Sequence, residues 1–179
     1  LVTCEANVHP ILSKETLAPD VVRLWPEAPA IGPKRRPAQL VIIRVSAEGE
    51  RIPLTIADAD PARGAISLIG QGVGESTKQI NSLEPGDAIT DVAGPLGLPT
   101  KIEPGKRVCC IGGGIGTAVV YPIATGVKQL DGWVVAIVGA RTKDLVILEE
   151  DMRRVSDRLI VTTDDGSYGM HGFVTDALK

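Results

Sequence analysis

The chain has 179 residues, of which 44% are hydrophobic, and a formal net charge of −3 with acidic and basic residues interspersed. This composition supports a folded core and excludes a largely disordered chain. It gives no electrostatic case for binding nucleic acid, and no apolar run approaches the length of a membrane span. The three cysteines cannot all pair with one another, which is typical of a reduced, cytoplasmic setting.

Residues 1–100 are divided into short runs rich in Val, Ile and Leu, and turn signals separate the runs at the spacing of an all-β barrel. We therefore predict a six-stranded antiparallel β-barrel domain over residues 1–100. The predicted strands are His9–Leu17, Val21–Pro26, Gln39–Val45, Arg51–Ala57, Ala65–Gly70 and Asp87–Ala93. A short helix is predicted over Ser76–Leu83, with Ser76 as its N-cap.

Residues 105–179 alternate between strand and helix patterns, which predicts a Rossmann-like α/β domain. Three continuous apolar runs indicate parallel strands buried on both faces. They are Val108–Ile111, Trp133–Val138 and Leu159–Thr162. Leu145, Leu148, Met152 and Val155 recur at helical spacing and predict one helix before the third strand. Because the chain starts at Leu1 rather than Met and stops at Lys179 within a helical pattern, we expect a fragment whose second domain is incomplete at its C-terminus.

The strongest motif is the glycine loop Gly112–Gly116, which directly follows the first of these parallel strands. Glycines allow several backbone N–H groups to converge on a phosphate at the start of the next helix. The motif departs from a strict G-x-G-x-x-G because Thr117 stands at the third glycine position. The alternative interpretation is a tight strand-to-helix turn that binds no ligand.

The next two strands also end in polar loops. Gly139, Arg141 and Lys143 follow the second strand. The two cations either contact the phosphates or nicotinamide half of a nucleotide or lie in a solvated loop whose Thr142 caps the next helix. Asp164 and Asp165 follow the third strand, and their carboxylates suit the two hydroxyls of an adenosine ribose. The alternative for these two residues is turn chemistry alone, because Asp-Asp-Gly-Ser is a favourable turn sequence.

Two segments of the barrel half are unusual. Arg51–Ile56 places Pro53 inside a strand, which leaves neighbouring backbone groups without ladder partners. Gly72–Thr77 places Ser76 and Thr77 at a helix start, where they suit a second phosphate group. Ordinary barrel architecture is the alternative for both segments. The sequence contains no recognisable set of acid, base or nucleophile side chains, so no catalytic residue and no metal ligand set is predicted.

These segments together resemble the ferredoxin–NADP reductase superfamily. The resemblance covers nearly the whole chain and is carried by RIPLTI, GVGESTKQI, GPLG, GGGIGTA, GAR and TDDGSYGMHGFVTD. Within the superfamily the chain is most similar to FAD- and NAD-binding electron-transfer subunits of multi-subunit complexes. Such complexes include NADH-dependent ferredoxin:NADP oxidoreductase and dihydroorotate dehydrogenase.

The resemblance implies a cofactor role for particular residues. The family's flavin strand falls on Arg51, Pro53, Leu54 and Thr55, although Arg51 is four residues before Thr55 where the wider superfamily has Arg-x-Tyr-Ser. The flavin contacts of the next strand fall on Ile69, Gly70 and Gln71, and the flavin pyrophosphate contacts on Ser76 and Thr77. The NAD contacts fall on Gly113, Gly114, Gly116, Thr117, Gly139, Arg141, Asp164 and Asp165.

The resemblance also implies an activity. We expect an FAD-dependent NAD(P)H oxidoreductase subunit that passes hydride between NAD(H) and FAD and single electrons to an iron–sulfur or ferredoxin-type partner. We further expect a larger catalytic oxidoreductase subunit as a partner, and a [2Fe–2S] centre only in a segment beyond Lys179. The alternatives are the electron-transfer subunit of a dihydroorotate dehydrogenase, in pyrimidine biosynthesis, and a non-catalytic interaction module.

Overall fold

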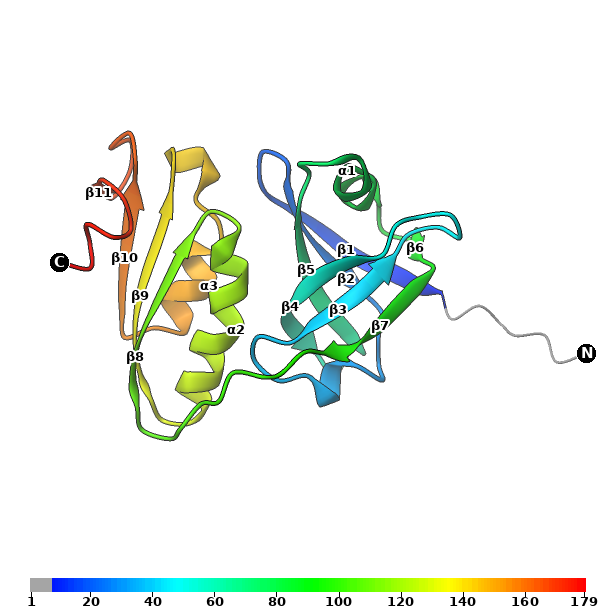
Figure 1. Cartoon of the computed structure of the whole chain (residues 1–179), viewed down its shortest axis with the longest axis horizontal. Helices are drawn as coiled ribbons and strands as arrows, with labels where there is room; N and C mark the ends of the chain where they lie inside the picture. The colour runs from blue at the N-terminus through cyan, green and yellow to red at the C-terminus, as the bar shows by residue number, and fades with distance from the viewer. Residues whose placement is uncertain (1–7) are drawn as a thin grey trace, which may run out of the picture. The chain divides into compact units, whose positions relative to one another are not determined.

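The computed structural model describes residues 8–179, which form two compact units joined near Gly97 and Leu98 (Figure 1). The first unit is a nearly closed antiparallel β-barrel, and the second is a parallel α/β sheet with helices. Cys4 lies outside the described residues. The predicted fold class is confirmed.

Seven strands make the barrel sheet in the described part of the chain, in the order β6-β1-β2-β5-β4-β3-β7. Their bounds are β1 His9–Ala18, β2 Val21–Pro26, β3 Leu40–Arg44, β4 Ile52–Asp60, β5 Ala65–Gln71, β6 Ala88–Ile89 and β7 Asp91–Leu96. The predicted count of six strands was wrong by one, because the last apolar run is interrupted at Thr90 and pairs in two places. Its first part, β6, pairs with β1, whereas its second part, β7, pairs with β3.

The barrel core follows from strand alternation. Ile56 is 1% exposed in the core, and Ile52 and Leu54 pack against the same cluster. Since successive side chains of a strand point to opposite faces, Pro53 and Thr55 lie on the other face of β4. The core cluster thereby fixes which face of β4 is available to a ligand.

Helix α1 (Glu75–Ser82) follows β5 and lies at one end of the barrel (Figure 1). It buries Ile80 in the barrel core, where Ile80 is 2% exposed. The N-cap residue is Gly74, so the prediction of Ser76 as N-cap was wrong, and Ser76 lies in the first turn instead. A 3₁₀ segment, η1 (Gly32–Lys34), precedes β3.

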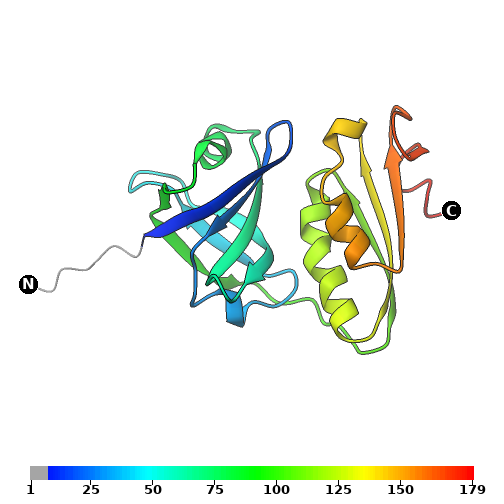
Figure 2. The ribbon, with the colours of Figure 1, turned by 180° about the vertical axis from the view of Figure 1, so that it is seen from behind.

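The second unit contains a four-stranded sheet in the order β11-β10-β9-β8, and every adjacent pair is parallel. The elements are β8 Arg107–Gly113, α2 Gly116–Gln129, β9 Trp133–Ala140, η2 Lys143–Leu145, α3 Glu149–Arg154, β10 Arg158–Thr163 and β11 Met170–His171. Helices α2 and α3 cover the same face of the sheet in both views (Figures 1 and 2). Parallel strands bring the carboxyl ends of β8, β9 and β10 to one edge.

The single helix predicted from Leu145 to Val155 is divided into two pieces, so that prediction was wrong. The 3₁₀ segment η2 ends at Leu145, and α3 begins at Glu149. Leu148 between them has φ of 58°, a left-handed conformation that interrupts any right-handed helix. Leu148 is nevertheless only 6% exposed, because the interruption lets its side chain pack in the interior. Apolar periodicity alone carries no signal of such a break.

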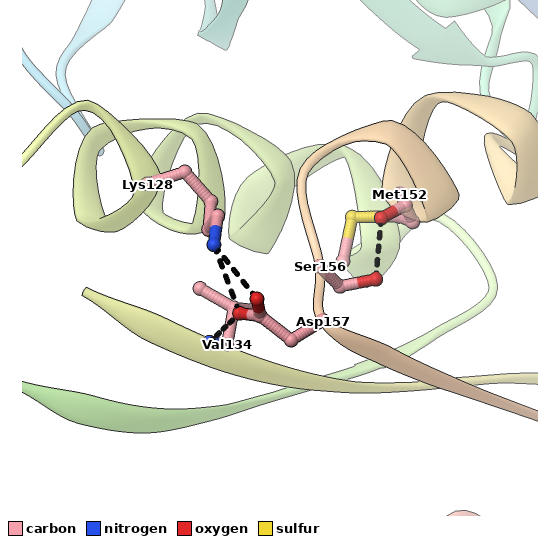
Figure 3. Close-up of polar contacts among 5 residues, drawn as sticks. All are labelled: Lys128, Val134, Met152, Ser156 and Asp157. Atoms are coloured by element: carbon pink, nitrogen blue, oxygen red, sulfur yellow. Dashed lines mark hydrogen bonds and ion pairs between the residues drawn. The ribbon is translucent and has the colours of Figure 1, made fainter. Parts of the chain in front are cut away.

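The amino ends of β9 and β10 are joined by a polar cluster around Asp157 (Figure 3). The Asp157 carboxylate accepts a hydrogen bond from the Val134 N–H at 2.8 Å and pairs with the Lys128 ammonium at 2.9 Å. These donors, the Val134 N–H first, hold the pKa of Asp157 below its usual value. Nearby, the Ser156 hydroxyl donates to the Met152 carbonyl at 2.7 Å. The cluster lies at the end of the sheet opposite to the glycine loop.

Candidate functional site

The glycine loop connects the carboxyl end of β8 to the first turn of α2. Gly114 has φ of 52°, a conformation that glycine adopts without steric cost. Its N–H donates to the carbonyl of Gly139 at 2.7 Å, which ties the loop to the end of β9. The loop is therefore held by backbone groups of two adjacent strands.

The glycines of this loop are needed for different structural reasons. A Cβ on Gly112 would lie 2.7 Å from Thr117 Cα and 2.9 Å from Thr117 N, so Gly112 permits close packing of β8 on α2. At Gly113, Gly114 and Gly116, a Cβ would have no heavy atom of residues 8–179 within 4 Å. The loop thus presents open space on its outer side, beside the first N–H groups of a 14-residue helix. Such a cradle suits a phosphate group.

Thr117 occupies the position where the motif normally has its third glycine. Its side chain is 1% exposed, and its hydroxyl donates to the carbonyl of Gly112 at 3.4 Å. Because Gly112 has no Cβ, β8 and α2 approach each other closely without a glycine at position 117. This explains how the motif tolerates a threonine, and it places the Thr117 hydroxyl in the interior of the loop.

Gly139 and Arg141 at the end of β9 lie in different environments. A Cβ on Gly139 would lie 2.4 Å from Val174 Cγ1 and 2.6 Å from Thr162 Oγ1, so Gly139 is required for packing. Arg141 is exposed, and its guanidinium has no hydrogen-bond or ion-pair partner within residues 8–179. The expected cap by Thr142 is not formed, because the Thr142 hydroxyl contacts the Asp144 carboxylate. Arg141 is therefore a cation available to a ligand.

The two aspartates after β10 also differ. The Asp165 carboxylate accepts the Ser167 N–H at 2.9 Å, and the Ser167 hydroxyl and N–H hold its pKa below the usual value. Asp165 thus performs the turn chemistry that was the alternative interpretation. Asp164 is exposed, and its carboxylate has no partner in the described part of the chain. Of the two, Asp164 is the carboxylate that can accept ligand hydroxyls without breaking a turn.

The loops after β9 and β10 contact each other through Lys143, a predicted nucleotide contact, and through Tyr168, to which the sequence prediction gave no role. The Lys143 N–H donates to the Ser167 hydroxyl at 2.9 Å, and the Lys143 ammonium lies 5.3 Å from the centroid of the Tyr168 ring. The Tyr168 hydroxyl donates to Glu149 at 3.0 Å, and this carboxylate raises the pKa of Tyr168. These contacts connect residues 19 to 25 positions apart, which no local motif signals.

In the barrel, the structure separates Arg51 from the other predicted flavin residues. Arg51 precedes β4, is exposed, and lines a cavity of about 800 Å³ with residues such as Ile42, Arg44 and Asp91. Of the residues predicted to bind flavin, all of which the structure describes, Arg51 alone lines this cavity. Pro53, Leu54 and Thr55 lie within β4, where Pro53 and Thr55 face outward and Leu54 packs against the barrel core.

The remaining predicted flavin residues are brought together by β5 and α1. Ile69, Gly70 and Gln71 end β5, and a Cβ on Gly70 would lie 3.0 Å from Asn81 Oδ1 of α1. Gly70 therefore allows α1 to pack closely on the strand. The helix start that carries Ser76 and Thr77 is thus held next to the end of β5.

The hydroxyl groups in the first turn of α1 already have hydrogen-bond partners within the protein. The Thr77 hydroxyl accepts the Gly74 N–H at 2.9 Å, as an N3 side chain does in a capping box, and it also donates to the Gly74 carbonyl at 3.0 Å. The Ser76 hydroxyl donates to the carboxylate of Glu50. A carboxylate at this turn is a stand-in for an anionic ligand, so the residues present fit a phosphate group.

Within residues 8–179, no three His, Cys, Asp or Glu side chains are grouped in a way that could hold a metal ion. In the same part of the chain, no helix has both the length and the apolar character needed to cross a membrane.

No family model matches the chain. Its fold is similar to solved structures of reductases. It matches the NADH-dependent reduced ferredoxin-NADP oxidoreductase, known for flavin-based electron bifurcation, with a TM-score of 0.91 and 40% identity, covering 98% of this chain and 63% of that chain. It also matches the ferredoxin reductase in carbazole 1,9a-dioxygenase with a TM-score of 0.76 and 21% identity, over 96% of this chain and 55% of that one. These matches define a ferredoxin reductase-like fold.

Curated relatives specify the family. The chain is 43% identical over 171 residues to a dihydroorotate dehydrogenase B (NAD(+)) electron transfer subunit homolog of Thermotoga maritima, covering 96% of this chain and 60% of the relative. It is 32% identical over 175 residues to the dihydroorotate dehydrogenase B (NAD(+)) electron transfer subunit of Geobacillus thermodenitrificans, covering 94% of this chain and 67% of that subunit. The chain belongs to this family of electron-transfer subunits within the ferredoxin–NADP reductase superfamily. It spans about 60% of the length of the Thermotoga relative.

Proposed function

We propose that this chain is the FAD- and NAD-binding part of a cytoplasmic electron-transfer oxidoreductase subunit. The proposal rests on two helix starts, one in each unit, whose groups suit an anion, in a chain of this family. One is the first turn of α1 in the barrel, and the other is the glycine loop before α2. A protein that binds two dinucleotides needs two such turns.

In the barrel unit, FAD would be held by β4, the end of β5 and the start of α1. The outward face of β4 offers Pro53 and Thr55 to the ring system, because Ile52, Leu54 and Ile56 point into the core. The Ser76 and Thr77 hydroxyls at α1 would contact the pyrophosphate. Arg51 would act as a neighbouring cation, since its guanidinium has no partner within residues 8–179.

In the α/β unit, NAD(H) would be held at the carboxyl edge of the sheet. The open side of Gly113, Gly114 and Gly116 would receive the pyrophosphate. Arg141 would pair with a phosphate oxygen, and Asp164 would accept the hydroxyls of the adenosine ribose. A carboxylate in that position repels a 2′-phosphate, so NAD is favoured over NADP.

When bound, the flavin supplies hydride exchange with the nicotinamide and release of single electrons. The residues of this chain bind and orient the two cofactors, and no general acid or base from the protein is needed for that exchange. The electrons would pass to a larger catalytic subunit and a ferredoxin-type or iron–sulfur carrier. A [2Fe–2S] centre would require cysteine ligands outside this sequence.

Absorption spectroscopy of the purified protein after incubation with FAD and removal of free flavin tests the proposal. We expect a yellow protein that retains about one FAD per chain. A correctly folded protein that stays colourless would contradict the flavoprotein assignment and would favour a non-catalytic interaction module. Circular dichroism of the same sample establishes whether it is folded.

The second candidate is the electron-transfer subunit of a dihydroorotate dehydrogenase in pyrimidine biosynthesis, and the names of the curated relatives favour it. The 40% identity to the ferredoxin-NADP oxidoreductase favours the first candidate. Purification of the tagged protein from its native host distinguishes them. Co-purification of a dihydroorotate dehydrogenase subunit supports the second candidate, and co-purification of a ferredoxin-dependent reductase subunit supports the first.

A further inference from the structure

The contact between Ser76 and Glu50 joins the start of α1 to the loop between β3 and β4. These residues are 26 positions apart, and the Ser76 hydroxyl donates its hydrogen bond to the Glu50 carboxylate. Both belong to the barrel unit. Ser76 is one of the two residues proposed above to contact the pyrophosphate of FAD.

The loop that carries Glu50 is anchored on the side that follows β3. Arg44 pairs with Asp91 of β7 at 2.6 Å and donates to the carbonyl of Ala47 at 2.8 Å. The Gly49 N–H donates to the carbonyl of Ser46 at 3.0 Å, which closes a tight turn directly before Glu50. The carboxylate is therefore presented to α1 by an ordered turn.

The chemistry of Ser76 makes this contact exclusive. A serine hydroxyl has one proton, so it donates to one acceptor at a time. A diphosphate group that takes this hydrogen bond must displace the Glu50 carboxylate. Two anions next to the same helix start also repel each other, and this repulsion favours departure of the side chain.

We propose that Glu50 is an internal competitor for the FAD diphosphate at the start of α1. The Glu50 carboxylate accepts the Ser76 hydrogen bond, and the FAD diphosphate takes that hydrogen bond only as this contact breaks. Glu50 thereby lowers the affinity for FAD and sets how readily the subunit gains or loses its flavin. The inference rests on the proposed flavin site and adds a device that regulates its occupancy.

The test compares FAD affinity among the flavin-free wild type, Glu50→Gln, Glu50→Ala and Glu75→Gln, using quenching of flavin fluorescence. Glu75 is the matched control, because it is an acidic residue in the same helical turn and the Ser76 hydroxyl donates to Glu50 instead of to the Glu75 carboxylate. We expect both Glu50 variants to bind FAD about three- to tenfold more tightly, whereas Glu75→Gln changes the affinity by less than about twofold. Riboflavin, which lacks phosphates, should bind all four proteins equally.

The outcomes separate this inference from the proposed function. If FAD binds the wild type and both Glu50 variants with equal affinity, the competitor role is wrong and the flavin site stands. Equal tightening by Glu75→Gln also overturns it, because general charge would then explain the effect. If no protein binds FAD, the flavin site itself is wrong. Thermal melting shows whether each variant is folded, and Glu50→Gln keeps the shape of the side chain in case Glu50→Ala unfolds.

Discussion

The two turns proposed to bind phosphate are built from different chemical groups. At α1 of the barrel the turn relies on side-chain hydroxyls, and both hydroxyls already have partners within the protein. At α2 of the α/β unit the turn relies on glycine backbone, and its outer side is open. The first turn must therefore rearrange to bind an anion, whereas the second is preorganised.

This difference predicts different consequences of substitution. Preorganised backbone turns are sensitive to any added side-chain atom, because the ligand approaches the backbone itself. Side-chain turns lose individual hydrogen bonds and are affected less by each change. The experiments below either sharpen this distinction or remove it, from the largest expected effect to the smallest.

Alanine substitutions at adjacent glycines separate binding from packing in the α/β unit. Gly113→Ala places a methyl group in the open space, so it should weaken NADH binding by about tenfold or more with little change in stability. Gly112→Ala places it 2.7 Å from Thr117 Cα and should destabilise the fold by about 1–3 kcal/mol. Calorimetric titration with NADH and thermal melting measure the two effects. Normal NADH binding by Gly113→Ala would show that the loop is only a structural turn.

Replacing Asp164 with Ser and Asp165 with Arg should shift the preference towards NADPH by about tenfold, because the repelling Asp164 carboxylate is removed and a cation is added beside it. The single variants refine this prediction. Asp164→Asn should weaken NADH binding, whereas Asp165→Asn should chiefly disturb the turn that Ser167 stabilises. Unchanged NADH and NADPH affinities in the double variant would contradict the role given to the carboxylates.

At the barrel turn, Thr77→Val removes the hydroxyl that bridges the N–H and carbonyl of Gly74 and keeps the shape of the side chain. We expect a loss of about 1 kcal/mol in the free energy of unfolding and about fivefold weaker FAD binding. Denaturant unfolding and flavin fluorescence measure these effects. An effect as large as that of Gly113→Ala on NADH would remove the distinction between the two turns.

The polar cluster around Asp157 tests whether the glycine loop depends only on contacts at its own edge of the sheet. Asp157→Asn should lower the melting temperature modestly and leave NADH binding unchanged. The folded-state pKa of Asp157 is lowered, so its contribution is present above the unfolded-state pKa of about 3.9 and is lost as the pH falls through the lower folded value. Melting temperatures of wild type and variant should therefore converge in acid. A constant difference down to the lowest pH would refute this assignment.

The sequence predicted strands well because each has a simple physical signature. The continuous apolar runs of β8 and β9 and the alternation of Ile52, Leu54 and Ile56 both follow from which strand faces are buried. The division of the predicted helix at Leu148 was missed, because a left-handed residue leaves the apolar spacing unchanged. Apolar spacing likewise gave no indication that β6 and β7 pair with different strands.

The candidate site was predictable to the extent that it is local. The glycine loop and the Asp164–Asp165 turn are each contained in a few consecutive residues. Their residues have different structural roles, however. Gly112 and Asp165 stabilise the fold through neighbours such as Thr117 and Ser167, whereas Gly113 and Asp164 have no such neighbour in the described residues. Glu50 was missed altogether, because its contact with Ser76 spans 26 positions and follows no motif.

The most direct test of a two-cofactor electron-transfer subunit is to add NADH anaerobically to the FAD-loaded protein and to measure the visible absorption of the flavin. The account predicts that NADH bleaches the flavin band of the wild type, that NADPH does so far less effectively, and that Gly113→Ala retains FAD but needs more NADH. An FAD-loaded, folded wild type whose flavin stays oxidised at saturating NADH would contradict the account.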